Sequence, residues 1–210
     1  MKSLKESIFS NVDDIASNDN ALIEQFINNN YEIDGTYVVK NNTVDVKGCV
    51  RVKNTNIESL TNGIFRFGNV NGGFSCPSCI NLKSLKGAPE KVSLWFNCNG
   101  CRSLKTLEGS PKEVGGDFDC TYCKNLKSLE GAPEKVGQEF RCGNCPGLTS
   151  LEGSPKEVRW SFVCSRCENL TSLKGAPKKV GEFIVCAKCP KLITTSQDRK
   201  KYKLKYTSEE

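Results

Sequence analysis

The stretch FDCTYCKNLKSLEGAPEKVGQE, residues 118–139, decides the fold because the chain repeats its frame every 22 residues. This frame reads F-x-C-x-x-C-x-x-L-x-[ST]-L-x-G-[AS]-P-x-x-V, and it continues without insertion or deletion. The first position of the frame is phenylalanine in five repeats and Ile184 in the sixth. The five phenylalanines that open the frame are Phe74, Phe96, Phe118, Phe140 and Phe162. A fixed period of this length indicates a repeat architecture.

The length and turns of the unit predict one coil of a β-solenoid. A unit of 22 residues is too short for two helices, and its Gly-x-Pro turn breaks any helix that crosses it. We expect two short extended segments, one around V-x-x-x-F-x-C and one at L-x-[ST]-L. Stacked coils would then place Phe on Phe, Val on Val, Leu on Leu and Cys on Cys, about 4.8 Å apart. The predicted fold is mainly β, a short β-solenoid whose stability lies in the stacking.

The charged pair after each proline alternates in order from coil to coil. It reads Glu90-Lys91, Lys112-Glu113, Glu134-Lys135 and Lys156-Glu157, and then Lys178-Lys179. Stacking in register places each Glu beside a Lys, until Lys178 meets Lys156. We infer that the alternation controls the register. Duplication of a two-repeat unit explains it equally well.

The two ends differ from the repeat. We predict that residues 1–73 form a small α/β N-terminal cap, that six coils occupy 74–195, and that 196–210 are a basic C-terminal cap or tail. In the cap, ALIEQFINNN (21–30) indicates an amphipathic helix, and 31–52 alternates like strands. The details expected there are a helix face of Leu22, Ile23, Phe26 and Ile27, turns at Asp34-Gly35 and Asn41-Asn42, and a degenerate coil at Ile57-Glu58-Ser59-Leu60.

Charge, hydropathy and cysteine content together predict the cellular compartment of the protein. The 210 residues carry a modest formal charge of +6, and only RKKYKLKY (199–206) is a clearly basic run. No stretch approaches the roughly 20 apolar residues of a membrane span, and the N-terminus has no apolar signal-peptide core. We therefore expect a protein that is not exported by a signal peptide, has no membrane partner, and keeps its 13 cysteines reduced in the cytoplasm.

The frame F-x-x-x-x-C-x-x-L-x-x-L-x-x-x-P, formed here by Phe118, Cys123, Leu126, Leu129 and Pro133, resembles the bacterial leucine-rich repeat of the Treponema pallidum type. The resemblance covers about 74–195. The chain is also similar to uncharacterised repeat proteins of bacteriophages and prophages of gut Bacteroidales, and more weakly so in its leader MKSLKES (1–7). This resemblance implies leucine-rich-repeat-like coils, a phage-encoded protein of the host cytoplasm or virion, and a role in binding another macromolecule. It carries no catalytic residues.

Six Cys-x-x-Cys pairs admit three interpretations. They can be buried ladders, since reduced cysteine packs as a small hydrophobe, they can be all-thiolate zinc sites, or they can form disulfides or do redox work. We favour ladders, no cofactor and no metal, and keep zinc as the alternative. The residues that a metal would use are Cys76, Cys79, Cys98, Cys101, Cys120, Cys123, Cys142, Cys145, Cys164, Cys167, Cys186 and Cys189.

No catalytic constellation is visible. The chain has no histidine, which excludes Cys/His nucleophilic catalysis. It has no phosphate loop of the G-x-x-x-x-G-K-[ST] type. Acidic residues are scattered without a converging pair. We predict that the protein is not an enzyme.

Positions that vary between coils are the candidates for partner contact. The residue before the second cysteine runs Ser78, Gly100, Tyr122, Asn144, Arg166, Lys188. Two tryptophans stand just before the Phe positions, and they serve equally well as cover for a coil edge. The predicted contacts to a protein partner are Trp95, Tyr122, Trp160 and Arg166. Two alternatives stay open, a zinc-dependent nucleic-acid binder and a purely structural virion component, although the alternating Glu/Lys face argues against nucleic acid.

Overall fold

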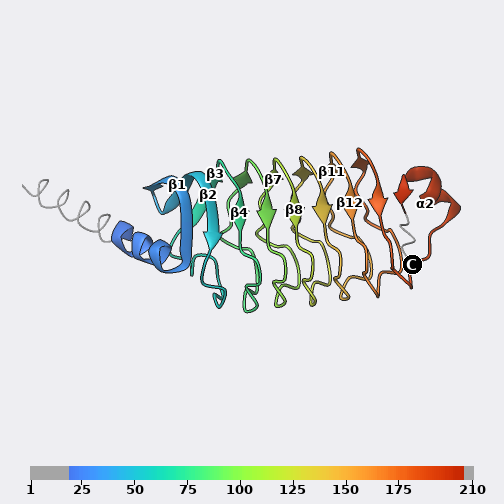
Figure 1. Cartoon of the computed structure of the whole chain (residues 1–210), viewed down its shortest axis with the longest axis horizontal. Coiled ribbons are helices and arrows are strands. Elements are labelled where there is room, and N and C mark those ends of the chain that lie inside the picture. Colours follow the sequence, from blue (N-terminus) through green and yellow to red (C-terminus); the bar gives the residue numbers. More distant parts are fainter. Residues whose placement is uncertain (1–18, 206–210) are drawn as a thin grey trace, which may run out of the picture.

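The computed structural model describes residues 19–205 and confirms the predicted β-solenoid, with about seven coils spaced about 22 residues apart. The coils stack side by side in chain order from the N-terminal cap to the C-terminal end (Figure 1). Each coil contributes two short strands, which join those of neighbouring coils in two parallel rows. Expectations for residues 1–18, including the leader and the lack of a signal peptide, and for 206–210 lie outside the described residues.

We call the two rows the Val row and the Phe row. Each strand pairs in register with its equivalents one coil away, so that Val114 lies beside Val136 and Phe118 beside Phe140. The Val row contains β5 (Lys91–Val92), β7 (Glu113–Val114), β9 (Lys135–Val136), β11 (Glu157–Val158) and β13 (Lys179–Val180). The Phe row contains β4 (Phe74–Ser75), β6 (Phe96–Asn97), β8 (Phe118–Asp119), β10 (Phe140–Arg141), β12 (Phe162–Val163) and β14 (Ile184–Val185).

The N-terminal cap starts both rows with one long strand. β2 (Thr43–Val52) pairs antiparallel with β1 (Tyr31–Lys40). Its first half pairs with β3 (Arg66–Val70), which continues into the Val row, and its second half pairs with β4. Residues 19–30 form the predicted helix (blue in Figure 1). At the other end, α2 (Ser196–Lys201) leads to β15 (Leu204–Lys205), which pairs with β14.

The core consists of ladders of identical side chains. Phe74, Phe96, Phe118, Phe140 and Phe162 are fully buried, with neighbouring rings parallel within 1–9° and their centroids 5.0–5.4 Å apart. The paired leucines of the frame are buried in every coil from Leu82 to Leu173, as are the valines from Val92 to Val158. In the degenerate coil, Ile57 and Leu60 are buried too. The apolar positions of the frame are therefore the interior of the solenoid.

The predicted pairing of charges along the Val row is confirmed. Glu113 lies in register between Lys91 and Lys135, and its carboxylate is 3.0 Å from the Lys91 ammonium. Lys156 contacts Glu134 at 2.9 Å. These lysines lower the pKa of Glu113 and of Glu134, mainly by hydrogen bonding to the carboxylates. Like charges in one register would have repelled each other.

The predictions for both extended segments of the repeat unit are wrong. Val and Phe do not share one extended segment, because the chain bends at 115–117 and places Val114 and Phe118 in different rows. L-x-[ST]-L is not a strand. Its backbone still bonds between coils, with the Leu129 amide donating to the Glu152 carbonyl at 3.1 Å.

Two details of the cap are also wrong. Asp34-Gly35 is not a turn, since Gly35 lies inside β1 opposite Gly48, so close that a Cβ would meet the Lys47 carbonyl. Leu22 does not face the core, because it is 50% exposed, whereas Ile23 and Ile27 are buried and Phe26 is half-buried. The turn predicted at Asn41-Asn42 is present, with φ of 50° and 53°.

Candidate binding surface at the cysteine corners

The cysteines form two buried ladders at one corner of the coil. Both members of every pair are buried from Cys76 to Cys167, and Cys189 in the last coil is half-buried. The second thiol of a pair donates to the carbonyl of the first cysteine one coil earlier, as from Cys123 to Cys98 at 3.3 Å. The same bond occurs from Cys101 to Cys76, Cys145 to Cys120, Cys167 to Cys142 and Cys189 to Cys164, at 3.1–3.4 Å. These thiols act as hydrogen-bond donors and packing groups.

Burial weakens the acidity of several of these thiols. Desolvation raises the pKa of Cys142 and of Cys164 well above the ordinary value, and it raises the pKa of Cys167 to about 12. The thiolate is the form that attacks electrophiles and binds metals. Between residues 19 and 205, no group of three or more His, Cys, Asp or Glu side chains is placed to hold a metal ion. Zinc remains a hypothesis for metal analysis.

The residue before the second cysteine has a left-handed backbone in every coil. We call this column the corner ridge: Ser78, Gly100, Tyr122, Asn144, Arg166 and Lys188, with φ between 54° and 70°. Each amide that precedes the last coil donates to a carbonyl of the next coil, as from Tyr122 to Gly143 at 3.0 Å, which fixes the corner. Glycine and asparagine tolerate this conformation, whereas other residues lose on the order of 1 kcal/mol there.

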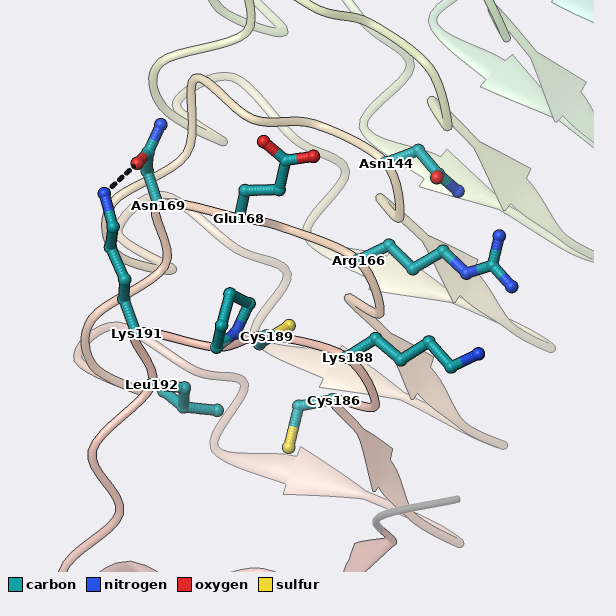
Figure 2. A pocket seen from close by; sticks show the side chains of 10 residues that line it. Asn144, Arg166, Glu168, Asn169, Cys186, Lys188, Cys189, Lys191 and Leu192 are labelled. Carbon is teal, nitrogen blue, oxygen red and sulfur yellow. Dashed lines mark hydrogen bonds between the residues drawn. The ribbon is translucent and has the colours of Figure 1, made fainter. Parts of the chain in front are cut away.

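Three ridge side chains line an open cavity at the C-terminal end of the described chain. It is a broad open depression of about 1140 Å³ over the last two coils. Figure 2 shows Asn144, Arg166 and Lys188 extending to the same side, one above the other. The depression is also lined by Glu168, Asn169 and Lys191, with the Lys191 ammonium 2.7 Å from the Asn169 side-chain oxygen, and by the half-buried Cys189 and Leu192. Charged, amide and apolar groups thus share one depression.

The structure brings only two of the four predicted contact residues onto this ridge. Tyr122 is 49% exposed and Arg166 is exposed. Trp160 is 45% exposed, but it precedes β12 on the opposite side of the Phe row from Arg166. Trp95 is half-buried over Gly73, where a Cβ would lie 2.2 Å from the indole ring. Trp95 therefore packs on the backbone next to the N-terminal cap, as the alternative interpretation of the tryptophans expected.

Sequence reasoning missed how unevenly the net charge is distributed along the chain. Residues 156–205 carry 13 Lys and Arg against four Asp and Glu, a net +9, whereas the whole chain carries +6. The C-terminal end of the chain, which comprises the last coils and the segment after them, is therefore strongly basic, and the rest of the chain is slightly acidic. Counting charge by segment would have found this signal. Lys188 and Lys191, which line the depression, belong to this basic end.

Comparison of the chain with protein-family models, with curated proteins and with solved structures gives no match. Within residues 19–205, no helix is both long and apolar enough to cross a membrane.

Proposed function

We propose that this protein is a non-enzymatic binding module that docks a protein partner on the corner ridge. The observation that carries the proposal is the type of residue that occupies the left-handed positions of the ridge. Four of its six positions hold Ser78, Tyr122, Arg166 and Lys188 where glycine or asparagine would fit without strain. Strained residues persist where the surroundings hold them, and they cluster at functional sites.

The pattern of variation supports the same surface. The buried frame positions repeat almost unchanged, whereas the ridge residue differs in every coil. Variation of exposed positions on a constant scaffold is how repeat proteins build a binding surface. Exposed tyrosine and arginine are also enriched among the residues that dominate interface energies.

A role without catalysis agrees with the chemistry of the chain. The protein has no histidine, and burial raises the pKa of ladder thiols such as Cys142 and Cys164, which leaves little thiolate there. The resemblance of the frame to phage and prophage repeat proteins supports an action in the bacterial host cell or in the virion.

The test replaces Tyr122, Arg166 and Lys188 together by glycine, which suits the left-handed backbone. We expect the variant to keep the stability of the parent protein and to lose its partner. Affinity capture from host lysate identifies the partner, and calorimetry with the purified partner measures the affinity. The matched control uses the exposed second residue of the L-x-[ST]-L segments, a surface that we call the leucine side. It replaces Lys105, Lys127 and Thr149 by alanine. Unchanged affinity of the glycine variant, or equal loss in the control, would exclude the ridge as the contact surface.

A further inference from the structure

The two rows end differently at the C-terminal end of the solenoid. The Phe row gains one more strand after the last repeat, because β15 pairs with β14 in parallel, with Leu204 opposite Ile184. Leu204-Lys205 does not belong to the repeat frame, so this end accepts a strand without the full coil. In the Val row, β13 pairs with β11 and is the last strand among the described residues. Its far edge pairs with no other strand of residues 19–205.

The hydrogen bonds of the Val row show what this edge offers. Along the row, amides of each coil donate to carbonyls of the coil before, as from Gly137 to Val114 at 2.8 Å and from Gly181 to Val158 at 3.1 Å. By the same pattern the carbonyls of Lys178, Val180 and Glu182 point away from β11. An unpaired strand edge of this kind is a template for another strand. The edge presents acceptors, so an added parallel strand must bring N–H donors.

The apolar ladder is also incomplete at this edge. Val92, Val114, Val136 and Val158 are only 1–2% exposed, whereas Val180 is half-buried. An open cavity of about 460 Å³ borders Val180 and continues to Lys201, Tyr202 and Lys203 of the C-terminal segment. An apolar residue on an added strand would cover Val180 as each valine covers the one before it.

The charge at the edge selects the partner. Lys178 stands where the alternation of the row would have placed a glutamate, and it stacks beside the position of Lys156. Lys179 reaches back to Glu157 at 3.7 Å, and its side chain is 76% exposed. Lys201 and Lys203 are exposed on the other wall of the cavity. Acidic residues beside Lys178 and Lys179 would restore the alternation that the other coils show.

We propose that the open edge of β13 binds an extended acidic segment of another protein by strand addition. The segment lies parallel to β13, donates backbone N–H groups to the Lys178, Val180 and Glu182 carbonyls, and places two acidic residues beside Lys178 and Lys179. Main-chain bonds supply affinity in this mode and the side-chain positions supply specificity. This site is separate from the corner ridge, and it does not depend on the function proposed for the ridge.

The test uses the full chain and the synthetic peptide APEEVGEF, which is the sequence of residues 176–183 with both lysines changed to glutamate. We expect it to bind about tenfold or more tightly than APKKVGEF, the unchanged sequence, and less tightly as salt rises. A third peptide replaces its glycine by N-methylglycine, which removes the N–H that would donate to Val180. We expect a loss of about tenfold with the charges unchanged.

Reversal of charge on the protein provides the matching control. The double variant Lys178→Glu, Lys179→Glu should prefer the lysine peptide, whereas Lys105→Glu, Lys127→Glu, the same change of charge on the leucine side, should behave as the parent protein. If the N-methyl peptide binds as tightly as its parent and single-stranded DNA competes equally, the edge is a general polyanion patch and the proposal is wrong. If peptide affinity appears only after residues 206–210 are deleted, the occupant is the chain's own C-terminus and the proposal is also wrong.

Discussion

Removal of one ring from the middle of the phenylalanine ladder should strongly destabilise the array. Phe118 is fully buried, and its ring centroid lies 5.3 Å from that of Phe96 and 5.0 Å from that of Phe140. Replacement of a buried phenylalanine by alanine costs about 3–5 kcal/mol. The two stacked contacts, each worth about 0.5–1.5 kcal/mol, place Phe118→Ala in the upper half of that range. Such a loss approaches the whole stability of a small protein.

Two variants calibrate this loss. Phe183→Ala removes a ring that is 40% exposed, and we expect it to cost less than about 1 kcal/mol. Phe118→Leu keeps the position apolar, and we expect a loss of about 1–1.5 kcal/mol. Urea unfolding followed by circular dichroism gives the three free energies of unfolding. If Phe118→Ala costs no more than Phe183→Ala, the stacked ladder is not what holds the coils together.

The position of Phe118 allows a second readout. Trp95 and Trp160 lie in coils on either side of it, so their fluorescence reports on the two halves of the array. Coils contact only their neighbours in a repeat protein, and a break in the middle uncouples the halves. We expect the two tryptophans, measured in single-tryptophan versions of Phe118→Ala, to change at different urea concentrations, and to change together with Phe118 intact.

Three further predictions follow from the thiols and the charges. At pH 8 an alkylating reagent should label Cys189 and Cys49, which are half-buried, before buried cysteines such as Cys142 and Cys164, whose pKa is raised, and mass spectrometry of labelled peptides reads the order. Protein purified without chelators should contain much less than one zinc per chain by elemental analysis, and near-stoichiometric zinc would overturn the assignment of the cysteines to packing. Stability should fall as pH drops below about 4.5, because the lowered pKa values of Glu113 and Glu134 favour the folded state only while these carboxylates are ionised; a melting temperature that is flat from pH 6 to pH 3.5 would contradict it.

The sequence was sufficient to predict the stacking because each buried position repeats at a fixed interval. A one-coil repeat with identical apolar residues has one register that buries all of them, and the alternation of Glu113 and Lys135 favours the same register. The charge pattern also locates the point where the stack changes, at Lys178. Local residue types thus specified long-range pairing, which is uncommon for parallel strands.

The path of the chain within a coil could not be predicted in the same way. Val114 and Phe118 are four residues apart, so both face inward whether the chain is straight or bends between them. The chain bends at Gly115-Gly116 in this coil but equally at Ser93-Leu94 and Arg159-Trp160 in others, so no residue type at these positions signals the bend. Gly35 shows the same ambiguity: Asp-Gly is a turn signal, yet here glycine allows β1 to approach β2 closely.

The sequence names the ridge residues as candidates for partner contact but cannot rank them, for a related reason. The sequence shows that the ridge residue varies, but variation alone does not distinguish a contact residue from one that nothing constrains. The backbone adds a criterion, because an unconstrained left-handed corner would favour Gly or Asn, as at Gly100 and Asn144. Tyr122 and Arg166 are present against this preference. The Cys-x-x-Cys motif therefore matters less for its sulfur atoms than for the corner that the two buried thiols hold in place between them.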